Sequence, residues 1–223
     1  MGFRYLETDL HVTADGVLVA FHDERLDRVT NRRGRIAELP WDAVAGAVVE
    51  GSESVLAFAD LLERFPDARI NLDPKDDAVV AHLAKILLSA DAVNRVCVSS
   101  FRRRRARRVK RLVEQASTMP LCTGAGPLGT FLLVCGVPFH RPFRHLDVVQ
   151  VPARWGPIPV VTRRFVRRAH RRGLHVHVWT VDQPDEIRRL FDLGVDGVMS
   201  DDLEALAGVL AERGAGLQPP ECG

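Results

Sequence analysis

The chain has 223 residues, of which 46% are hydrophobic and 27% are charged. This length and composition are typical of one folded globular domain and exclude a mainly disordered protein. A formal net charge of +2 gives the whole protein no strong preference for nucleic acid or a membrane, and no apolar run approaches the roughly 20 residues of a membrane-spanning helix.

Short apolar runs rich in β-branched residues alternate with longer segments of helical period, which predicts strand and helix units around a parallel sheet. Strands are expected at residues 5–10, 68–72, 95–99, 118–122, 147–151, 174–179 and 197–200. Helices are expected at residues 54–65, 77–89, 102–115, 162–172, 184–193 and 203–213, and a shorter one with loops within 124–142. A tight turn at Asp15-Gly16 predicts that residues 17–21 return as a strand beside the first.

Seven parallel strands are one short of the eight that close a TIM barrel. We therefore expect an α/β fold of the (β/α)8 TIM-barrel type whose first strand and helix would precede Met1. Residues 1–213 are predicted to form a single barrel domain, incomplete at its N-terminus, and residues 214–223 a flexible tail rich in Gly and Pro.

Two carboxylates mark the first expected strand. Glu7 and Asp9 are two residues apart, so their side chains point to the same face. Like charges buried together require neutralisation, and hard oxygen ligands suit Mg²⁺ or Ca²⁺ better than zinc. The alternative is an exposed acidic pair on an edge strand.

Two further charged residues follow the next barrel strand. Asp73 could complete the protein ligands of a metal, and Lys75 brings a positive charge to the same rim. A phosphodiester transition state needs such a cation, because negative charge grows on the non-bridging oxygens as the nucleophile adds. The Asp-Pro-Lys tripeptide could instead be only a turn.

His22 ends the returning strand, and its imidazole can transfer protons near neutral pH. A leaving alkoxide requires such a group. Asp23 could orient the ring or cap the following turn, and a structural role for the histidine is the alternative.

These motifs together resemble the glycerophosphodiester phosphodiesterase family. The chain carries, in order, E-x-D at Glu7, D-G-x-x-V-x-x-H-D at Asp15 and L-D-R-x-T-N at Leu26. Residues 71–75, 99–101, 177–182 and 193–201 resemble later strand ends of the same family. The match extends to about residue 206.

The resemblance implies a metal-dependent TIM-barrel hydrolase that converts a glycerophosphodiester into sn-glycerol 3-phosphate and an alcohol. Glu7, Asp9 and Asp73 fall on the family's metal-ligand positions, for Mg²⁺ or Ca²⁺. His22 falls on one of two acid/base histidines, and Lys75 on the phosphate-stabilising lysine. Trp179 falls on an aromatic position of the substrate pocket, with a place in the barrel core as its alternative.

Two departures from the family pattern concern the site. Asp73 stands where the family often has glutamate, which is one methylene longer. The family's opening His-Arg-Gly strand, which supplies the second histidine and an arginine, would lie before Gly2. We expect either a truncated start or a natural short form that binds metal and phosphate without turnover.

The segment from Arg102 to Arg111 has eight basic residues in ten. It could bind nucleic acid or an anionic membrane without being an enzyme. No aromatic residues interleave the charges, and Ala106, Val109, Leu112 and Val113 give an apolar stripe, so a solvated helix face is favoured. With no signal-peptide pattern at the start, a cytoplasmic protein acting on a small molecule, without nucleic acid or membrane insertion, is expected.

Overall fold

The computed structural model describes residues 2–136 and 145–214. The chain divides into two compact units, residues 5–122 and residues 1–4 with 123–223, and each is described by itself. Along the described residues, no helix combines the length and the apolar character that crossing a membrane requires.

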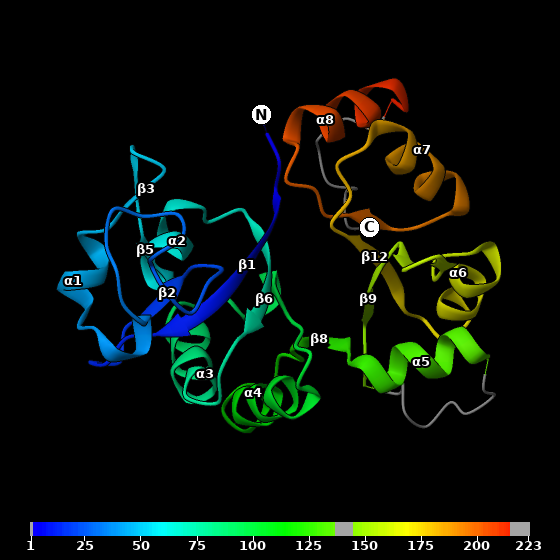
Figure 1. Ribbon diagram of the computed structural model, residues 1–223. Coiled ribbons are helices and arrows are strands. Elements are labelled where there is room, and N and C mark those ends of the chain that lie inside the picture. The colour runs from blue at the N-terminus through cyan, green and yellow to red at the C-terminus, as the bar shows by residue number, and fades with distance from the viewer. Residues whose placement is uncertain (1, 137–144, 215–223) are drawn as a thin grey trace. The chain divides into compact units, whose positions relative to one another are not determined.

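The first unit is built on a mixed sheet (Figure 1). Its strands run in the order β7-β6-β1-β2-β5, in which β1, β6 and β7 are parallel and β2 and β5 are antiparallel to their neighbours. The strand bounds are β1 Tyr5–Val12, β2 Leu18–Ala20, β5 Leu56–Ala57, β6 Arg69–Pro74 and β7 Val96–Val98. The predicted return of the chain after Asp15-Gly16 is confirmed.

Helices cover one face of this sheet. They are α2 Phe58–Arg64, α3 Val79–Ser89 and α4 Arg103–Ala116, and α3 lies beside α4 (Figure 1). The remaining elements are η1 Ile36–Glu38, α1 Trp41–Ala45, β3 Val48–Val49, β4 Glu53–Ser54 and η2 Val93–Arg95.

The two faces of β1 have opposite chemistry. Leu10 and Val12 belong to the buried apolar cluster that includes Leu83 of α3. Because side chains alternate along a strand, Glu7 and Asp9 point to the other face. Packing against the helices therefore leaves the carboxylates on the side of the sheet away from that cluster.

The second unit repeats the same layering. Its parallel strands run in the order β13-β12-β9-β8, with bounds β8 Cys122–Ala125, β9 Val148–Pro152, β12 His175–Trp179 and β13 Gly197–Val198. The helices are α5 Pro127–Cys135, α6 Arg163–His170, α7 Pro184–Leu193 and α8 Leu203–Glu212. A small hairpin, β10 Arg154–Trp155 with β11 Ile158–Pro159, separates β9 from α6.

Two predicted elements are wrong at their boundaries. The helix expected from residue 54 begins only at Phe58, because Leu56 and Ala57 pair with β2 as a strand. The strand expected at 118–122 begins only at Cys122, and Pro120, which has no N–H to donate, stands in the middle of the expected range. Residues 137–142 and the tail 215–223 lie outside the described part of the chain.

Candidate active site

The candidate site begins with the register of β1 and β6. These parallel strands pair Asp9 with Asp73 and Glu7 with Asn71. Residues paired across adjacent strands share a face of the sheet. The three predicted metal ligands of the chain are thus brought onto one face at neighbouring positions.

Lys75 links the two aspartates. Its Nζ lies 2.9 Å from Oδ1 of Asp9 and 2.9 Å from Oδ2 of Asp73. Asp9 keeps 7% of its side chain exposed, Asp73 13% and Lys75 30%. Burial alone would lower the pKa of the Lys75 ammonium, but its hydrogen bonds to Asp9 and Asp73 outweigh burial and raise that pKa.

Glu7 and Asp9 carry negative charge that Lys75 does not fully compensate. Desolvation, followed by repulsion from Asp9, raises the pKa of Glu7 to about 7. The Glu7 side chain is nevertheless exposed, so water screens part of this effect. Desolvation also raises the pKa of Asp9, against the opposing hydrogen bond from Lys75. This is the electrostatic signature of a site that attracts a further cation.

His22 reaches the same cluster from the chain segment after β2. Its Nε2 lies 3.7 Å from Oδ2 of Asp9, and its side chain is 77% exposed. On the other side of the ring, Nδ1 lies 2.6 Å from Oδ1 of Asp23. The predicted orienting role of Asp23 therefore agrees with this contact, and the exposed Nε2 faces the site.

Arg28 holds Asp23 in place and was not predicted as part of the site. Its Nε and one terminal nitrogen donate to both Asp23 oxygens, at 2.6 and 3.0 Å. Hydrogen bonds from Arg28 first, and then from His22, lower the pKa of Asp23 to about 2. Arg28 is the arginine of the L-D-R-x-T-N motif, so the sequence marked it as a candidate. Its contact with Asp23 could not be predicted, because that contact depends on how the loop folds.

Two other residues that hold the backbone of the site, His11 and Arg105, were not predicted from the sequence. His11 shares its face of β1 with Asp9, and its Nε2 lies 3.3 Å from the main-chain oxygen of His22. Arg105 of α4 donates to the main-chain oxygens of Pro74 and Lys75, which fixes the backbone that carries Lys75. Alternation along the strand places His11 on the same face as Glu7 and Asp9, so the sequence could have indicated His11. No sequence pattern indicated Arg105.

The carboxylates suit a hard divalent cation in type and charge. The carboxylate oxygens lie on adjacent strands, where Mg²⁺ or Ca²⁺ could bind them. Such a cation would neutralise the unfavourable negative charge that the raised pKa values of Glu7 and Asp9 indicate. Within residues 2–136 and 145–214, no three His, Cys, Asp or Glu side chains are grouped tightly enough to enclose a metal ion. The aspartates are instead drawn to Lys75.

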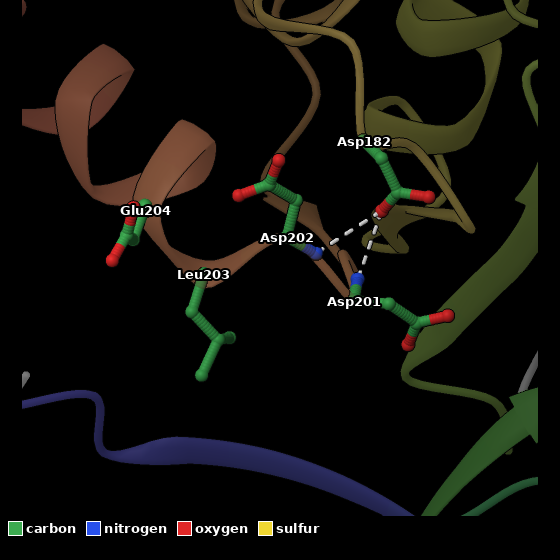
Figure 2. Close-up of a pocket in the computed structure, with 5 residues that line it drawn as sticks. All are labelled: Asp182, Asp201, Asp202, Leu203 and Glu204. Carbon is green, nitrogen blue, oxygen red and sulfur yellow. Dashed lines mark hydrogen bonds between the residues drawn. The ribbon is translucent and has the colours of Figure 1, made fainter.

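Trp179 lies in the second unit, where it is the last residue of β12 and is partly buried. Its predicted contact with substrate stays a prediction. The same unit has an open hollow of about 540 Å³ lined by acidic residues and Leu203 (Figure 2). There Oδ1 of Asp182 accepts hydrogen bonds from the main-chain N–H groups of Asp201 and Asp202, so it ties two loops together (Figure 2).

Comparisons with known proteins identify the family of the chain. The model of the glycerophosphoryl diester phosphodiesterase family matches residues 1–205. A probable glycerophosphodiester phosphodiesterase 2 of Mycobacterium tuberculosis is 38% identical over 221 residues, covering 96% of this chain and 82% of that protein. A glycerophosphodiester phosphodiesterase of Caldanaerobacter subterraneus is 26% identical and covers 96% and 88%.

Solved structures of similar proteins confirm the predicted TIM-barrel fold class. A putative glycerophosphoryl diester phosphodiesterase of Silicibacter pomeroyi superposes with a TM-score of 0.76 at 22% identity, covering 96% of this chain and 85% of that one. A phosphodiesterase of Oleispira antarctica, solved with its product sn-glycerol 3-phosphate, gives 0.73 at 17% identity, covering 94% and 86%. The chain belongs to the glycerophosphoryl diester phosphodiesterase family.

Proposed function

We propose that this protein hydrolyses glycerophosphodiesters to sn-glycerol 3-phosphate and an alcohol, with Glu7, Asp9 and Asp73 as ligands of Mg²⁺ or Ca²⁺. The observation that carries the proposal is the placement of Lys75 between two buried aspartates, in a chain of this family. The product bound to the Oleispira protein supports the same reaction. When bound, the cation would polarise the phosphoryl oxygens.

Lys75 would stabilise the phosphoryl group during the reaction. Negative charge grows on the non-bridging oxygens as the nucleophile adds to phosphorus, and a desolvated ammonium offsets this charge more strongly than one in water. Its raised pKa supports this role, since the amine remains protonated at neutral pH.

His22 would transfer the proton to the leaving group. As the bond between phosphorus and the alcohol oxygen breaks, that oxygen takes a proton from Nε2. Asp23 accepts from Nδ1 and so leaves Nε2 facing the site. The wide exposure of the ring leaves it open to a substrate arriving from solvent.

Trp179 would contact the glycerol or alcohol part of the substrate. Its indole is partly buried at the C-terminal end of β12, the end at which TIM-barrel enzymes bind their substrates. Replacing Trp179 by Phe should raise KM and leave kcat within about twofold, because such a contact is made equally in the ground and transition states.

The test is hydrolysis of glycerophosphocholine, measured as choline release in EDTA and after adding Mg²⁺ or Ca²⁺. Glu7→Gln, Asp73→Asn and Lys75→Met should each lower kcat/KM by about a hundredfold or more. Glu53→Gln, which changes an exposed carboxylate on β4 of the same unit, is the matched control. Calorimetry of Ca²⁺ binding tests the metal site independently of the reaction. An unchanged Ca²⁺ affinity in Glu7→Gln would refute Glu7 as a metal ligand. Ca²⁺ binding by the unaltered protein without any hydrolysis would refute the proposed enzymatic activity.

A further inference from the structure

The hairpin β10–β11 exposes two large apolar side chains. Trp155 keeps 77% of its surface exposed and Ile158 65%, and the two residues pair directly across the hairpin. Exposing an indole and an isoleucine side by side forgoes the free energy that their burial would supply. Such an exposed apolar tip is typical of a surface that binds a membrane or another protein.

The hairpin is held in this exposed shape by its own hydrogen bonds. Arg154 donates to the main-chain oxygen of Pro157 at 2.6 Å and so closes the turn. At its base, the N–H groups of Val160 and Val161 both donate to the oxygen of Ala153. Val160 and Val161 are buried in the core, which anchors the base. The exposed tip therefore projects from a fixed stem.

Basic side chains stand next to this tip. Arg163 and Arg164 open α6, only four and five residues after Pro159, which keeps their Cα atoms within roughly 14 to 18 Å of the hairpin. Both arginines and Arg167 are exposed, and α6 has no acidic residue in its first turn. Cations at a helix N-terminus oppose the helix dipole, so these arginines are not placed there for helix stability.

We propose that this hairpin, with Arg163 and Arg164, docks the protein reversibly on an anionic lipid surface. Trp155 and Ile158 would enter the headgroup region, where an indole is favoured because its ring is apolar and its N–H is polar. The arginines would then contact lipid phosphates, each adding electrostatic attraction that salt weakens. A nucleic acid is the poorer fit, because the isoleucine offers a base no stacking surface.

This inference concerns a surface and does not depend on the proposed reaction. Two exposed apolar side chains and a few cations give weak, reversible association. We expect binding to vesicles of equal parts phosphatidylcholine and phosphatidylglycerol, little binding to pure phosphatidylcholine vesicles, and release at high salt.

The full chain is tested by co-sedimentation with these vesicles. Trp155→Ser with Ile158→Ser should lower the vesicle affinity at least tenfold, and Arg163→Gln with Arg164→Gln should lower it several-fold and reduce its salt dependence. The matched control is Phe101→Ser with Arg107→Gln and Arg108→Gln, which removes an exposed aromatic and two exposed arginines from the first unit. The control should bind as the unaltered protein does, and thermal unfolding checks that each variant is folded.

Tryptophan emission gives a second measurement, which uses the unaltered protein and only the conservative substitution Trp155→Phe. Emission should shift to shorter wavelength on anionic vesicles and be quenched by brominated lipid, and Trp155→Phe should lose both effects while it still binds. The proposal is overturned by unchanged binding of the hairpin variants, by loss of binding only in the control with Phe101→Ser, Arg107→Gln and Arg108→Gln, or by an absence of vesicle binding in the unaltered protein. Preference for a DNA duplex over vesicles overturns it as well.

Discussion

Asp9 and Asp73 stand opposite each other on adjacent parallel strands and accept hydrogen bonds from the same ammonium group. Both carboxylates are largely buried, so neither is well solvated by water. Their mutual repulsion is therefore offset chiefly by Lys75. This relationship makes the lysine a structural counter-charge in the metal-free protein as well as a candidate for phosphate stabilisation.

Lys75→Met should destabilise the metal-free protein by about 1–3 kcal/mol, because it leaves two buried carboxylates without their partner. The measurement is thermal unfolding in EDTA, with Lys85→Met as the control, since Lys85 is exposed on α3. Adding Mg²⁺ or Ca²⁺ should raise the melting temperature more in Lys75→Met than in the unaltered protein. Equal melting temperatures in EDTA would contradict the counter-charge role.

The raised pKa of Glu7 predicts a pH dependence of stability. The pKa rises from 4.5 to about 7 on folding, so between these values the folded protein binds more protons than the unfolded chain. The free energy of unfolding should therefore fall as the pH rises from about 4.5 to about 7. Asp9 contributes with the same sign, and solvent contact at Glu7 makes the slope shallow.

Denaturant unfolding at several pH values in EDTA measures this slope. Glu7→Gln should flatten the slope and make the metal-free protein more stable at pH 7 than the unaltered protein. A bound divalent cation should also flatten it, since the carboxylates would then be neutralised by the ion. A free energy of unfolding that rises over this pH range would contradict the assignment of Glu7 to a crowded acidic cluster.

Much of the site could be predicted because it depends on local spacing. Glu7 and Asp9 share a face through the period of two along a strand, and Asp73 and Lys75 stand at the end of the next barrel strand. The pairing of Asp9 with Asp73 is different, because it depends on the register between two strands 64 residues apart in sequence. The hydrogen bond from Lys75 to both aspartates follows only from that register.

The supporting residues could not be predicted for a related reason. Arg28 reaches Asp23 through the path of a loop, and Arg105 reaches the backbone of Lys75 from α4, which follows α3 and β7 in the chain. Within the fold, the apolar run before Phe58 suits a strand and a helix equally, and pairing with β2 decides between them. Tertiary contacts, which no local pattern encodes, determine each of these outcomes.

Arg28 is expected to act as a positioning residue for His22. Arg28→Gln frees Asp23 and with it the imidazole, so kcat should fall roughly tenfold while KM stays the same. Arg28→Lys should restore part of the rate, since it keeps a cation beside Asp23. Arg25→Gln is the matched control, because Arg25 pairs with Asp27 in the same loop at 3.2 Å. A change in KM alone would assign Arg28 to substrate binding instead.

Thr162 caps the helix that follows the exposed hairpin. Its side-chain oxygen accepts a hydrogen bond from the N–H of Phe165 at 3.2 Å, and Phe165 is almost fully buried in the core. Thr162→Ala should lower the free energy of unfolding by about 1 kcal/mol, because it leaves that N–H without its partner. Thr162→Ser keeps the hydroxyl and should cost little. Equal losses in both variants, measured by urea unfolding, would show that the threonine methyl group, and not the cap, stabilises this end of α6.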